Sequence, residues 1–515
     1  MAPCPWDHDP QRSAPFPFGP ERGDARLRDL LITVERANKT AGWLHEHLRE
    51  HGSIACTTTA WARRNRTTGD TQTLRHAPSE PDRSRESVQT CAMADNATML
   101  QLNADPNFHF GLLRPMALSV YDGADISEVL TAAKGIIPGD FESFAGAFTR
   151  LADNVLARAK GILSKKFPVS ARTAFFSAAT YFRSADFYLH GNPSDPRIMD
   201  FWAKQTDAFD HGLALLDTPA KRVTVKTSDF DIPGIWMTPD DEVKRRPTII
   251  MGNGYDGAQE EMYHVFGLAA LERGYNVLTY EGPGQPAVRR YQNKGFIPDW
   301  ERVVTPLVDH VLRMKDRVDP GAIGLLGLSF GGYQAPRAAA FEHRLAAVMA
   351  IDGVWDFGGM IHKSFGPELM AIHAAGDKKR FDEISQKFLQ PGAPTDLRWG
   401  LEQGMWSFNT RSPFDFATLV TNYTLAGGIA QRVRTPTFVG DAEDDAQFRG
   451  QPKLLAEALG KWGHLHEFKS VDAIGTHSGI GALKQQSAVV LDWFQGVLDS
   501  KKGRDGGGGG GGGRA

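Results

Sequence analysis

The chain has 515 residues, 41% of them hydrophobic, and its 58 Lys and Arg residues nearly balance 61 Asp and Glu residues, for a formal net charge of −3. A chain of this length can bury a large core, enough for one catalytic domain and a helical accessory region. Proteins that hold nucleic acid or an anionic membrane surface need concentrated positive charge, so we expect a small-molecule partner and no nucleic acid. The sequence leaves open whether the chain forms a homodimer.

Residues 1–92 differ in composition from the rest of the chain. All three cysteines lie in this segment: Cys4, Cys56 and Cys91. Its polar and basic stretches lack sustained periodicity and bury too little apolar surface to offset the entropy of ordering. We therefore expect a disordered extension, or one that is not translated, with Met93 as the natural start. A helix over about Arg26–Glu50 and a targeting or regulatory role remain as alternatives.

The sequence shows no recognisable signal for export or membrane insertion. Its start is rich in Pro, Asp and Arg, where a secretory signal peptide needs an apolar stretch. No apolar run approaches the roughly 20 residues that span a bilayer. We therefore expect no membrane span and a location in the cytoplasm or in an intracellular vesicle.

Residues 93–220 have the apolar spacing of helices. Apolar side chains recur every three or four residues over Phe141–Arg158, Ala171–His190 and Ile198–Leu216. This spacing predicts amphipathic helices. We expect a helical cap domain ahead of the main sheet.

From residue 221 to about 500 the sequence alternates short apolar runs with helical segments. Val223, Val225 and the run Ile232–Met237 predict a hairpin. Six further runs bounded by Gly or Pro predict strands: Pro247–Gly252, Tyr275–Tyr280, Ala322–Gly327, Ala346–Ile351, Pro436–Gly440 and His466–Ser470. Helical segments separate most of these runs, which predicts an α/β fold with a mostly parallel sheet covered on both faces.

Two segments depart from this alternation. The stretch 353–435 is too long for one crossover helix and predicts an inserted helical lid, with helices at Pro367–Ala375 and Asp377–Phe388. Residues 501–515 include the polyglycine run Gly506–Gly513. We expect this end of the chain to be a flexible tail.

Ser329 is the candidate nucleophile, within the G-x-S-x-G motif Gly327–Gly331. The motif follows an apolar strand and precedes a helix, and small residues on both sides of the serine allow the tight turn that exposes its hydroxyl. The amide of Phe330 at the helix start would face a developing oxyanion. An ordinary glycine-rich turn is the alternative, and the strand before and helix after the motif disfavour it.

A serine of this kind needs a histidine late in the chain. His477 lies in a loop after the last predicted strand, whereas His464 precedes that strand and His466 lies within it. Loops at strand ends carry functional side chains more often than strand interiors do. We therefore prefer His477.

The acid of the triad is expected between the serine and the histidine, on the loop after the strand that starts at Pro436. Asp445 is the best-placed carboxylate, Asp444 is the next candidate, and Asp441 is expected to lie in the strand end. The acid would orient the imidazole and stabilise its charged form. The other carboxylates are expected to form a solvated acidic loop.

The loop Gly252–Gly257 is the candidate second half of an oxyanion hole. Its three glycines let the backbone approach a ligand closely, and the amides of Tyr255 and Asp256 would act beside that of Phe330. The carboxylate of Asp256 is unusual next to a developing negative charge. Two interpretations stay open for Asp256, namely a role in proton transfer or capping of the following helix.

These segments together resemble a known family. The resemblance rests on Gly252–Gly257, Tyr280–Pro286, the turn around Ser329, Asp441–Pro452 and the His477 loop. They resemble the fungal pigment-type polyketide-shortening hydrolases, which are similar to the bacterial 2,6-dihydropseudooxynicotine hydrolases and the FrsA-like esterases. The resemblance runs from about residue 105 to about residue 495.

The resemblance implies an α/β-hydrolase fold and hydrolysis of a carbon–carbon bond in an aromatic polyketide, a retro-Claisen type of side-chain shortening. It implies a pathway of pigment, such as melanin, or of other secondary metabolism. It places the nucleophile on Ser329, the acid on Asp445, the histidine on His477 and an extra acidic residue on Asp256. We expect no cofactor and no metal. A carboxylesterase, lactonase or thioesterase with the same triad is the alternative.

Four aromatic residues are expected to line the substrate pocket: Trp355, Phe357, Trp406 and Phe408. They lie in the predicted lid, which would cover an apolar pocket together with the helical domain. Ordinary core packing is the alternative for each.

Overall fold

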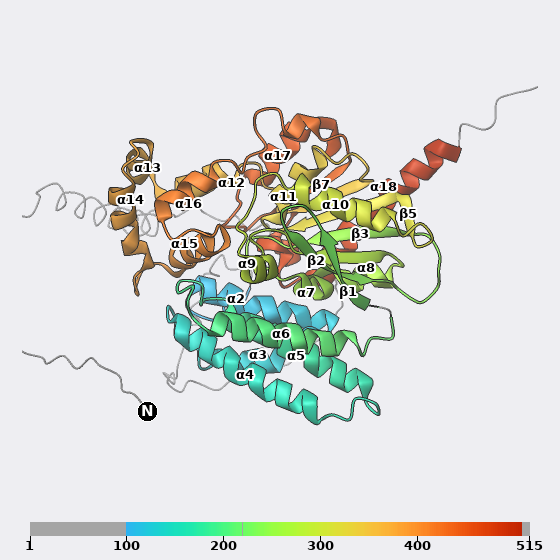
Figure 1. Cartoon of the computed structure of the whole chain (residues 1–515), viewed down its shortest axis with the longest axis horizontal. Coiled ribbons are helices and arrows are strands. Elements are labelled where there is room, and N and C mark those ends of the chain that lie inside the picture. The colour runs from blue at the N-terminus through green and yellow to red at the C-terminus, as the bar shows by residue number, and fades with distance from the viewer. Residues whose placement is uncertain (1–98, 219, 507–515) are drawn as a thin grey trace, which may run out of the picture. The chain divides into compact units, whose positions relative to one another are not determined.

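The computed structural model describes residues 99–218 and 220–506 (Figure 1). The predictions made for residues 1–92, and for the polyglycine run beyond Gly506, lie outside the described residues. The described chain contains a group of helices, an eight-stranded sheet with helices on both faces, and a helical insertion between two strands. None of its helices is both long enough and apolar enough to cross a membrane.

The helices ahead of the sheet, called the helical domain here, have these bounds: α2 (Pro106–Ala117), α3 (Ile126–Ala133), α4 (Phe141–Gly161), α5 (Pro168–Asp186) and α6 (Arg197–Leu213). Asp105 and Asp140 begin α2 and α4, since each side chain accepts hydrogen bonds from two amides of the first turn. Aromatic rings fill the interior, with Phe108, Phe144 and Tyr188 in mutual contact. The bounds agree with the predicted helices to within a few residues.

The sheet has the strand order β1-β2-β4-β3-β5-β6-β7-β8. Its strands are β1 (Ala220–Lys226), β2 (Asp231–Met237), β3 (Arg246–Gly252), β4 (Asn276–Tyr280), β5 (Val318–Leu328), β6 (Ala347–Ile351), β7 (Thr437–Ala442) and β8 (Gly463–Phe468). β1 and β2 form the predicted antiparallel hairpin, β2 is also antiparallel to β4, and all other neighbours are parallel. The prediction of an α/β-hydrolase fold with a mostly parallel sheet is therefore confirmed.

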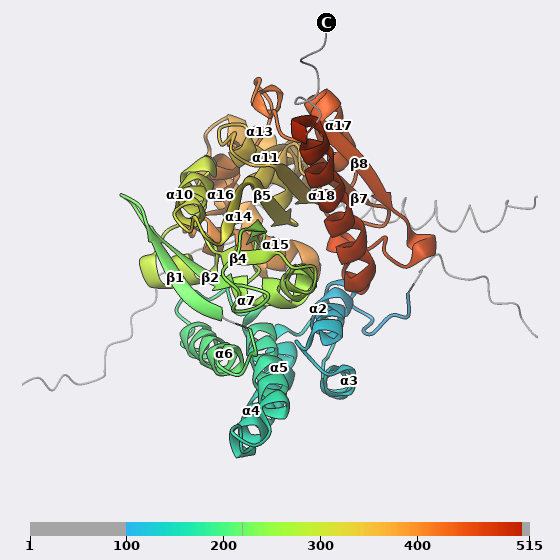
Figure 2. The same ribbon diagram turned by 90° about the vertical axis from the view of Figure 1, so that its right-hand side faces the viewer.

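Alternate residues of the central strands face two different cores. In β3, Ile249 and Met251 pack into one core and Ile250 into the other, as the two-residue period of a strand requires. The first core includes α7 (Gln259–Met262), a π-helical turn (Tyr263–Gly267), α8 (Leu268–Glu272), α18 (Leu483–Gly506) and the helical domain. The second includes α10 (Glu301–Leu312), α11 (Gly331–Ala339) and α17 (Gln451–Leu459), while α9 (Pro286–Gln292) follows β4. Figure 2 shows α18 crossing the sheet on the face opposite α10 and α11.

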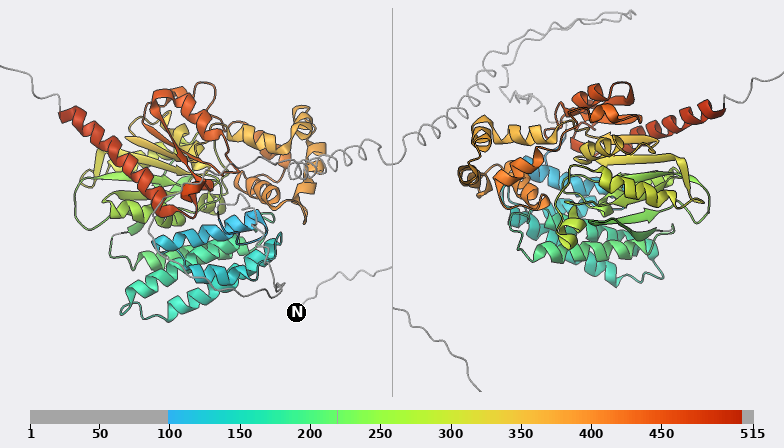
Figure 3. Two further views of the ribbon diagram at one scale, coloured as in Figure 1. Left: turned by 180° about the vertical axis from the view of Figure 1, so that it is seen from behind. Right: turned by 45° about the horizontal axis from the view of Figure 1, so that its top comes forward.

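The insertion between β6 and β7, called the lid here, comprises α12 (Phe357–Phe365), α13 (Pro367–Ala374), α14 (Lys378–Ser385), α15 (Thr395–Ser407) and α16 (Pro413–Val420). In Figures 1 and 3 its orange helices lie at one end of the sheet, near the helical domain. Leu369, Phe381 and Ala417 give it a small core of its own. The two lid helices predicted from the sequence correspond to α13 and α14.

Two predicted boundaries are wrong. β8 begins at Gly463, so that His464 lies inside this strand rather than before it. α18 continues to Gly506, although a flexible tail was expected from residue 501. Lys501 explains part of the difference, because its ammonium donates a hydrogen bond to the Ala346 carbonyl at 2.9 Å and so ties the helix end to the start of β6.

Candidate active site

Ser329 lies on a sharp turn between β5 and α11. Its φ of 59° is in the left-handed region, which a non-glycine residue adopts only where its surroundings enforce it. Gly327 makes the turn possible, because a Cβ on this residue would lie 2.0 Å from the carbonyl oxygen of Gly331. The G-x-S-x-G motif therefore has the strand–turn–helix context that a nucleophilic serine requires.

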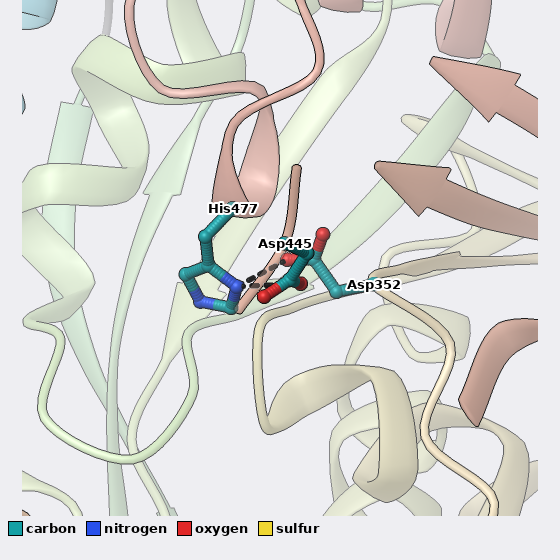
Figure 4. Close-up of side chains that lie close together, drawn as sticks. All are labelled: Asp352, Asp445 and His477. Carbon is teal, nitrogen blue, oxygen red and sulfur yellow. Dashed lines mark hydrogen bonds and ion pairs between the residues drawn. The ribbon is translucent and has the colours of Figure 1, made fainter. Parts of the chain in front are cut away.

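His477 links this serine to an acid. Its Nε2 atom lies 2.9 Å from Ser329 Oγ, and its Nδ1 atom lies 2.9 Å from Asp445 Oδ2 (Figure 4). The other oxygen of Asp445 accepts hydrogen bonds from the amides of Gln447 and Phe448, at 2.7 and 3.1 Å. The carboxylate is thus fixed in direction, and the three predicted residues form one chain of acid, imidazole and hydroxyl.

The other candidate residues do not belong to this series of hydrogen bonds. His464 and His466 are both in β8, with their rings near the Phe438 ring. Asp441 is in the end of β7, as expected. Asp444 accepts a hydrogen bond from the Ser470 hydroxyl, on the loop after β8. The geometry thus separates Asp445 from its neighbouring carboxylates, a distinction that the sequence left open for Asp444.

Burial and two neighbouring carboxylates determine the protonation of His477. Burial by itself favours the neutral ring, but Asp445 and Asp352 outweigh it and raise the pKa of His477 to about 9. Burial opposes the ionisation of Asp445, yet His477 and the amide hydrogen bonds lower the pKa of this carboxyl below its usual value. The site therefore stabilises an imidazolium next to a carboxylate, as a general base on a serine needs.

Asp352 is a second carboxylate beside His477 that the sequence analysis missed. It lies directly after β6 with a φ of 59°, and its Oδ2 atom lies 3.6 Å from His477 Nδ1 (Figure 4). Its oxygens accept hydrogen bonds from the amide of Ser478, at 2.9 Å, and from the Ser478 hydroxyl. Burial raises the pKa of Asp352 to about 6. Its place after a parallel strand, at the edge that β5 and β7 share, was the signal that could have found it.

The loop after β3 lies against the Ser329 turn. A Cβ on Gly254 would lie 2.7 Å from the Phe330 nitrogen and 3.0 Å from Ser329 Cβ, so this approach requires glycine. Within the described part of the chain, the amides of Phe330, Tyr255 and Asp256 donate to no acceptor. The three residues predicted to form an oxyanion hole therefore lie on two adjoining loops with their amides available.

Asp256 is held by the helical domain. Its Oδ1 atom accepts hydrogen bonds from Arg114 of α2, at 2.9 Å, and from Arg183 of α5, at 3.2 Å. Glu261 shares these cations, with Arg114 Nε 2.6 Å from its Oε1 atom. Despite burial, the two guanidiniums lower the pKa of Glu261 to about 2. The capping interpretation of Asp256 is wrong, since Ala258 is the residue before α7 and the first amide of this helix, that of Gln259, donates to Glu281 Oε1 at 2.9 Å.

The two arginines could not be predicted as partners of Asp256. They lie 142 and 73 residues away from it along the chain, and no local pattern marks them. Their ion pairs counterbalance the negative charge of Asp256 next to the candidate oxyanion hole. This arrangement favours a positioning role for Asp256 over proton transfer.

A cavity of about 990 Å³ reaches Ser329 and His477. The helical domain, the loop after β3, the lid and the loop after β7 all contribute to its wall. Its aromatic lining consists of Phe110, Phe187, Tyr255, Phe357, Phe365, Phe388, Trp399, Phe416 and Phe448. Two of these rings also flank the imidazole of His477, Phe448 at 5.3 Å and Phe110 at 5.8 Å between ring centroids.

Of the four aromatic residues expected in this lining, only Phe357 is found there. Trp406 lies about 10 Å further along α15 than Trp399, and its ring stacks on His190 instead. Phe408 is buried in the core against Phe296, and Trp355 packs against the same core. The expectation is wrong for Trp355, Trp406 and Phe408, because a place in the lid sequence does not show which aromatic side chains face the cavity and which pack into the core.

One group of potential metal ligands was found among the described residues, formed by Asp352, Asp445 and His477, with ligand atoms within 4.8 Å of one another. Each of these residues already takes part in the hydrogen bonds described above. His477 Nδ1 faces Asp445 as a donor, so its lone pair is not available to a cation at this nitrogen. We therefore interpret the group as acid–base machinery.

Comparison with known sequences gives relatives along most of the chain. Hydrolase acrC of Aspergillus aculeatus is 30% identical over 421 residues, which cover 77% of this chain and 97% of that protein. Hydrolase LUC6 of a Fusarium species is 29% identical, with coverage of 77% and 97%. The 20-hydroxy-prefusarin hydrolase FUS2 of Gibberella moniliformis is 28% identical, with coverage of 78% and 99%. No family model matches the chain.

Comparison with solved structures gives the same fold. The 2,6-dihydroxy-pseudo-oxynicotine hydrolase superposes with a TM-score of 0.56 at 20% identity, covering 75% of this chain and 96% of that one. AbyA5 superposes with a TM-score of 0.52 at 14% identity, covering 73% and 95%. The chain is thus an enzyme of the hydrolase class, and it belongs to the fungal polyketide-shortening family of α/β-hydrolases that its motifs resemble.

Proposed function

We propose that this hydrolase uses Ser329 to cleave a carbon–carbon bond next to a ketone in the side chain of an aromatic polyketide, in the formation of a pigment such as melanin or of another secondary metabolite. The observation that carries the proposal is the chain Asp445–His477–Ser329, which ends in a large cavity with an aromatic wall. The cavity volume of about 990 Å³ is at the upper end of the range for small-molecule pockets. A fused-ring substrate suits this size and lining.

The first half of the reaction forms an acyl-enzyme. His477 takes the proton of the Ser329 hydroxyl as the oxygen attacks the ketone carbon. The carbonyl oxygen becomes an oxyanion that accepts hydrogen bonds from the amides of Phe330 and of the Tyr255–Asp256 loop. Collapse breaks the carbon–carbon bond, and the electron pair stays on the leaving carbon as an enolate of the neighbouring carbonyl or ring.

The second half restores the enzyme. The imidazolium of His477 gives its proton to the leaving carbon, while Asp445 stabilises the charged ring without taking the proton. Water, deprotonated by His477, then attacks the acyl carbon and releases a carboxylic acid and the Ser329 hydroxyl. Because Asp256 pairs with two arginines, His477 is the proton donor that we assign to the leaving carbon.

The relatives support a substrate of this kind without fixing it. One relative is named a 20-hydroxy-prefusarin hydrolase, and one structure of the same fold is named a 2,6-dihydroxy-pseudo-oxynicotine hydrolase. We take from these names only that the fold serves the hydrolysis of small oxygenated molecules. The substrate bond that we propose this protein to cleave is inferred from the site.

The test is incubation of the purified protein with a naphthopyrone or naphthol that bears a 1,3-diketone side chain. Mass spectrometry should detect loss of an acetyl or acetoacetyl unit, together with the free acid, and Ser329→Ala should abolish both products. Hydrolysis of matched esters, lactones or thioesters with no turnover of the diketone would instead identify an ester hydrolase. Equal turnover by Ser329→Ala and the unaltered protein would contradict the assignment of the nucleophile.

A further inference from the structure

The lid helix α15 makes hydrogen bonds to both the side chain and the backbone of Tyr255, in the candidate oxyanion loop. The phenol of Tyr255 donates a hydrogen bond to the Gly400 carbonyl at 3.1 Å, and the backbone carbonyl of Tyr255 accepts one from Gln403 Nε2 at 3.2 Å. Gly404 lets the helix come this close, because a Cβ there would lie 2.3 Å from the Tyr255 hydroxyl oxygen. α15 therefore holds Tyr255 by its side chain and by its backbone.

The bond to the carbonyl also sets the direction of an amide. The described chain has no cis peptide bonds, so the C=O and N–H of each peptide unit point in opposite directions. Fixing the Tyr255 carbonyl against Gln403 therefore fixes the Asp256 N–H on the other side of the peptide plane. This N–H is one of the available amides next to the Ser329 turn.

The hydrogen-bond partners of Gln403 allow only one orientation of its side-chain amide. A backbone carbonyl can only accept, so the Gln403 nitrogen must face Tyr255, and it also lies 2.9 Å from Ser407 Oγ. The Gln403 oxygen must then face His190 Nδ1, 2.5 Å away. This contact requires hydrogen on Nδ1 of His190, whose Nε2 atom lies 3.0 Å from Arg290 Nη2 and 3.3 Å from Asp186 Oδ2.

The result is a chain of hydrogen bonds from His190 through Gln403 to the Tyr255 carbonyl, with Arg290 and Asp186 next to His190 at its outer end. Its outer end is fixed, because Arg290 also pairs with Asp186 at 2.6 Å and the His190 ring stacks on Trp406 with an interplanar angle of 3°. Gln403 itself is only 3% exposed. A buried amide that loses its hydrogen-bond partner must either reorient or stay unpaired, which costs free energy. These hydrogen bonds therefore constrain the Tyr255–Asp256 peptide strongly.

We infer that Gln403 is a positioning residue that couples the lid to catalysis, by holding the Tyr255–Asp256 peptide so that its N–H serves the oxyanion hole. The inference rests on the proposed role of this loop in the serine mechanism. When α15 leaves its docked position, the Tyr255 carbonyl loses both donors of this helix, Gln403 and the more distant Ser407 hydroxyl at 3.4 Å, and the hole loses a fixed amide. The lid is then part of the catalytic apparatus as well as a cover over the cavity.

The test measures the rate at which a fluorophosphonate labels Ser329 in the full chain. This probe needs the serine, the histidine and the oxyanion hole, but no carbon–carbon cleavage. Gln403→Met keeps the size of the side chain and removes the shorter of the two hydrogen bonds to the Tyr255 carbonyl, leaving that of the Ser407 hydroxyl at 3.4 Å. Gln403→Glu places an acceptor against the same carbonyl. Gln386→Met is the matched control, because Gln386 is an exposed glutamine of the same lid.

We expect both Gln403 variants to label on the order of 100-fold more slowly at saturating probe, with the probe concentration at half-saturation changed little. Gln386→Met should label at the rate of the unaltered protein. A structural role alone would lower the Tm of Gln403→Met but leave the labelling rate of the folded protein unchanged, and that result would overturn the inference. If the variant does not fold, His190→Phe keeps the stack on Trp406, removes the donor to Gln403, and should slow labelling about 10-fold.

Failure of the proposed function gives a different pattern. If the unaltered protein labels normally, does not cleave any 1,3-diketone and still shows the Gln403 effect, the substrate proposal falls and the coupling stands. If it cleaves the diketone and Gln403→Met labels at the normal rate, the coupling falls and the substrate proposal stands. If the unaltered folded protein does not label at all, both fall.

Discussion

Replacing Asp352 by Asn tests how the second carboxylate acts on His477. The change removes one negative charge 3.6 Å from Nδ1 and keeps an oxygen that can accept the Ser478 amide. Burial lowers the pKa of His477, while Asp445 and Asp352 raise it, with a net value of about 9. Without the Asp352 charge the pKa of His477 must fall.

The size of the fall follows from the distance. Two unit charges about 4 Å apart interact by about 4 kcal/mol at an effective dielectric constant of about 20, which corresponds to about 3 pKa units. Two effects weaken this interaction: the hydrogen bonds from Ser478 partly offset the Asp352 charge, and the nearby cavity admits water. We therefore expect a fall of at least about one unit, or about 1.4 kcal/mol.

The assay is the pH dependence of kcat/KM for an activated ester or for the diketone. A general base must be neutral to accept the Ser329 proton, so kcat/KM rises as pH increases through the pKa of His477. In Asp352→Asn this rise should begin at least about one pH unit lower, while the plateau at high pH falls because a less basic ring is a weaker base. Asp472→Asn, at an exposed carboxylate of the loop before His477, should leave the profile in place. An unchanged profile in Asp352→Asn would refute the electrostatic role.

Four further variants separate the remaining roles. Asp445→Asn should lower kcat on the order of 10⁴-fold, because it disturbs the tautomer of the His477 ring, whereas Asp444→Asn should change kcat by less than about 3-fold. Steady-state kinetics of the two variants decides which carboxylate is the acid. A larger loss of kcat in Asp444→Asn than in Asp445→Asn would contradict the geometry. Asp256→Asn leaves two buried guanidiniums with one carboxylate. It should reduce the free energy of unfolding, measured in urea, by about 3 kcal/mol. Unchanged stability together with a selective loss of carbon–carbon cleavage would support proton transfer instead. Gly254→Ala brings a methyl group against the Phe330 amide and the Leu328 carbonyl. It should lower kcat on the order of 100-fold and also lower Tm, because backbone atoms must shift, and normal turnover would show that this loop does not form the hole.

The residues of the candidate triad could be predicted because each of them follows the end of a strand. Ser329 follows β5, Asp445 follows β7 and His477 follows β8, and the carboxyl ends of parallel strands share one edge of a sheet. A motif, a loop position and a chain order were enough to choose Ser329 and His477, while Asp444 stayed open as an alternative to Asp445. Asp352 obeys the same rule after β6, but a single carboxylate at a strand end carries no pattern that distinguishes it.

The contacts that could not be predicted join segments far apart along the chain. Arg290 meets His190 100 residues away, and Arg114 meets Asp256 142 residues away. Each pairing depends on how the helical domain and the lid dock on the sheet, which periodicity does not encode. The same limit explains Trp406, whose burial was foreseeable but whose neighbour His190 was not.

The loop of Tyr255 and Asp256 receives contacts from three parts of the fold. From the sheet side, Gln285 in the turn before α9 donates hydrogen bonds to the Asn253 and Gly254 carbonyls, at 2.8 and 3.3 Å. The helical domain holds the Asp256 carboxylate, and the lid holds Tyr255. Each contact fixes a different peptide or side chain, so none can replace another. It follows that Asp445, His477 and Ser329 are placed by strand ends of the sheet, whereas the candidate oxyanion loop is held by all three parts. We therefore expect movement of the lid to affect the reaction through this loop.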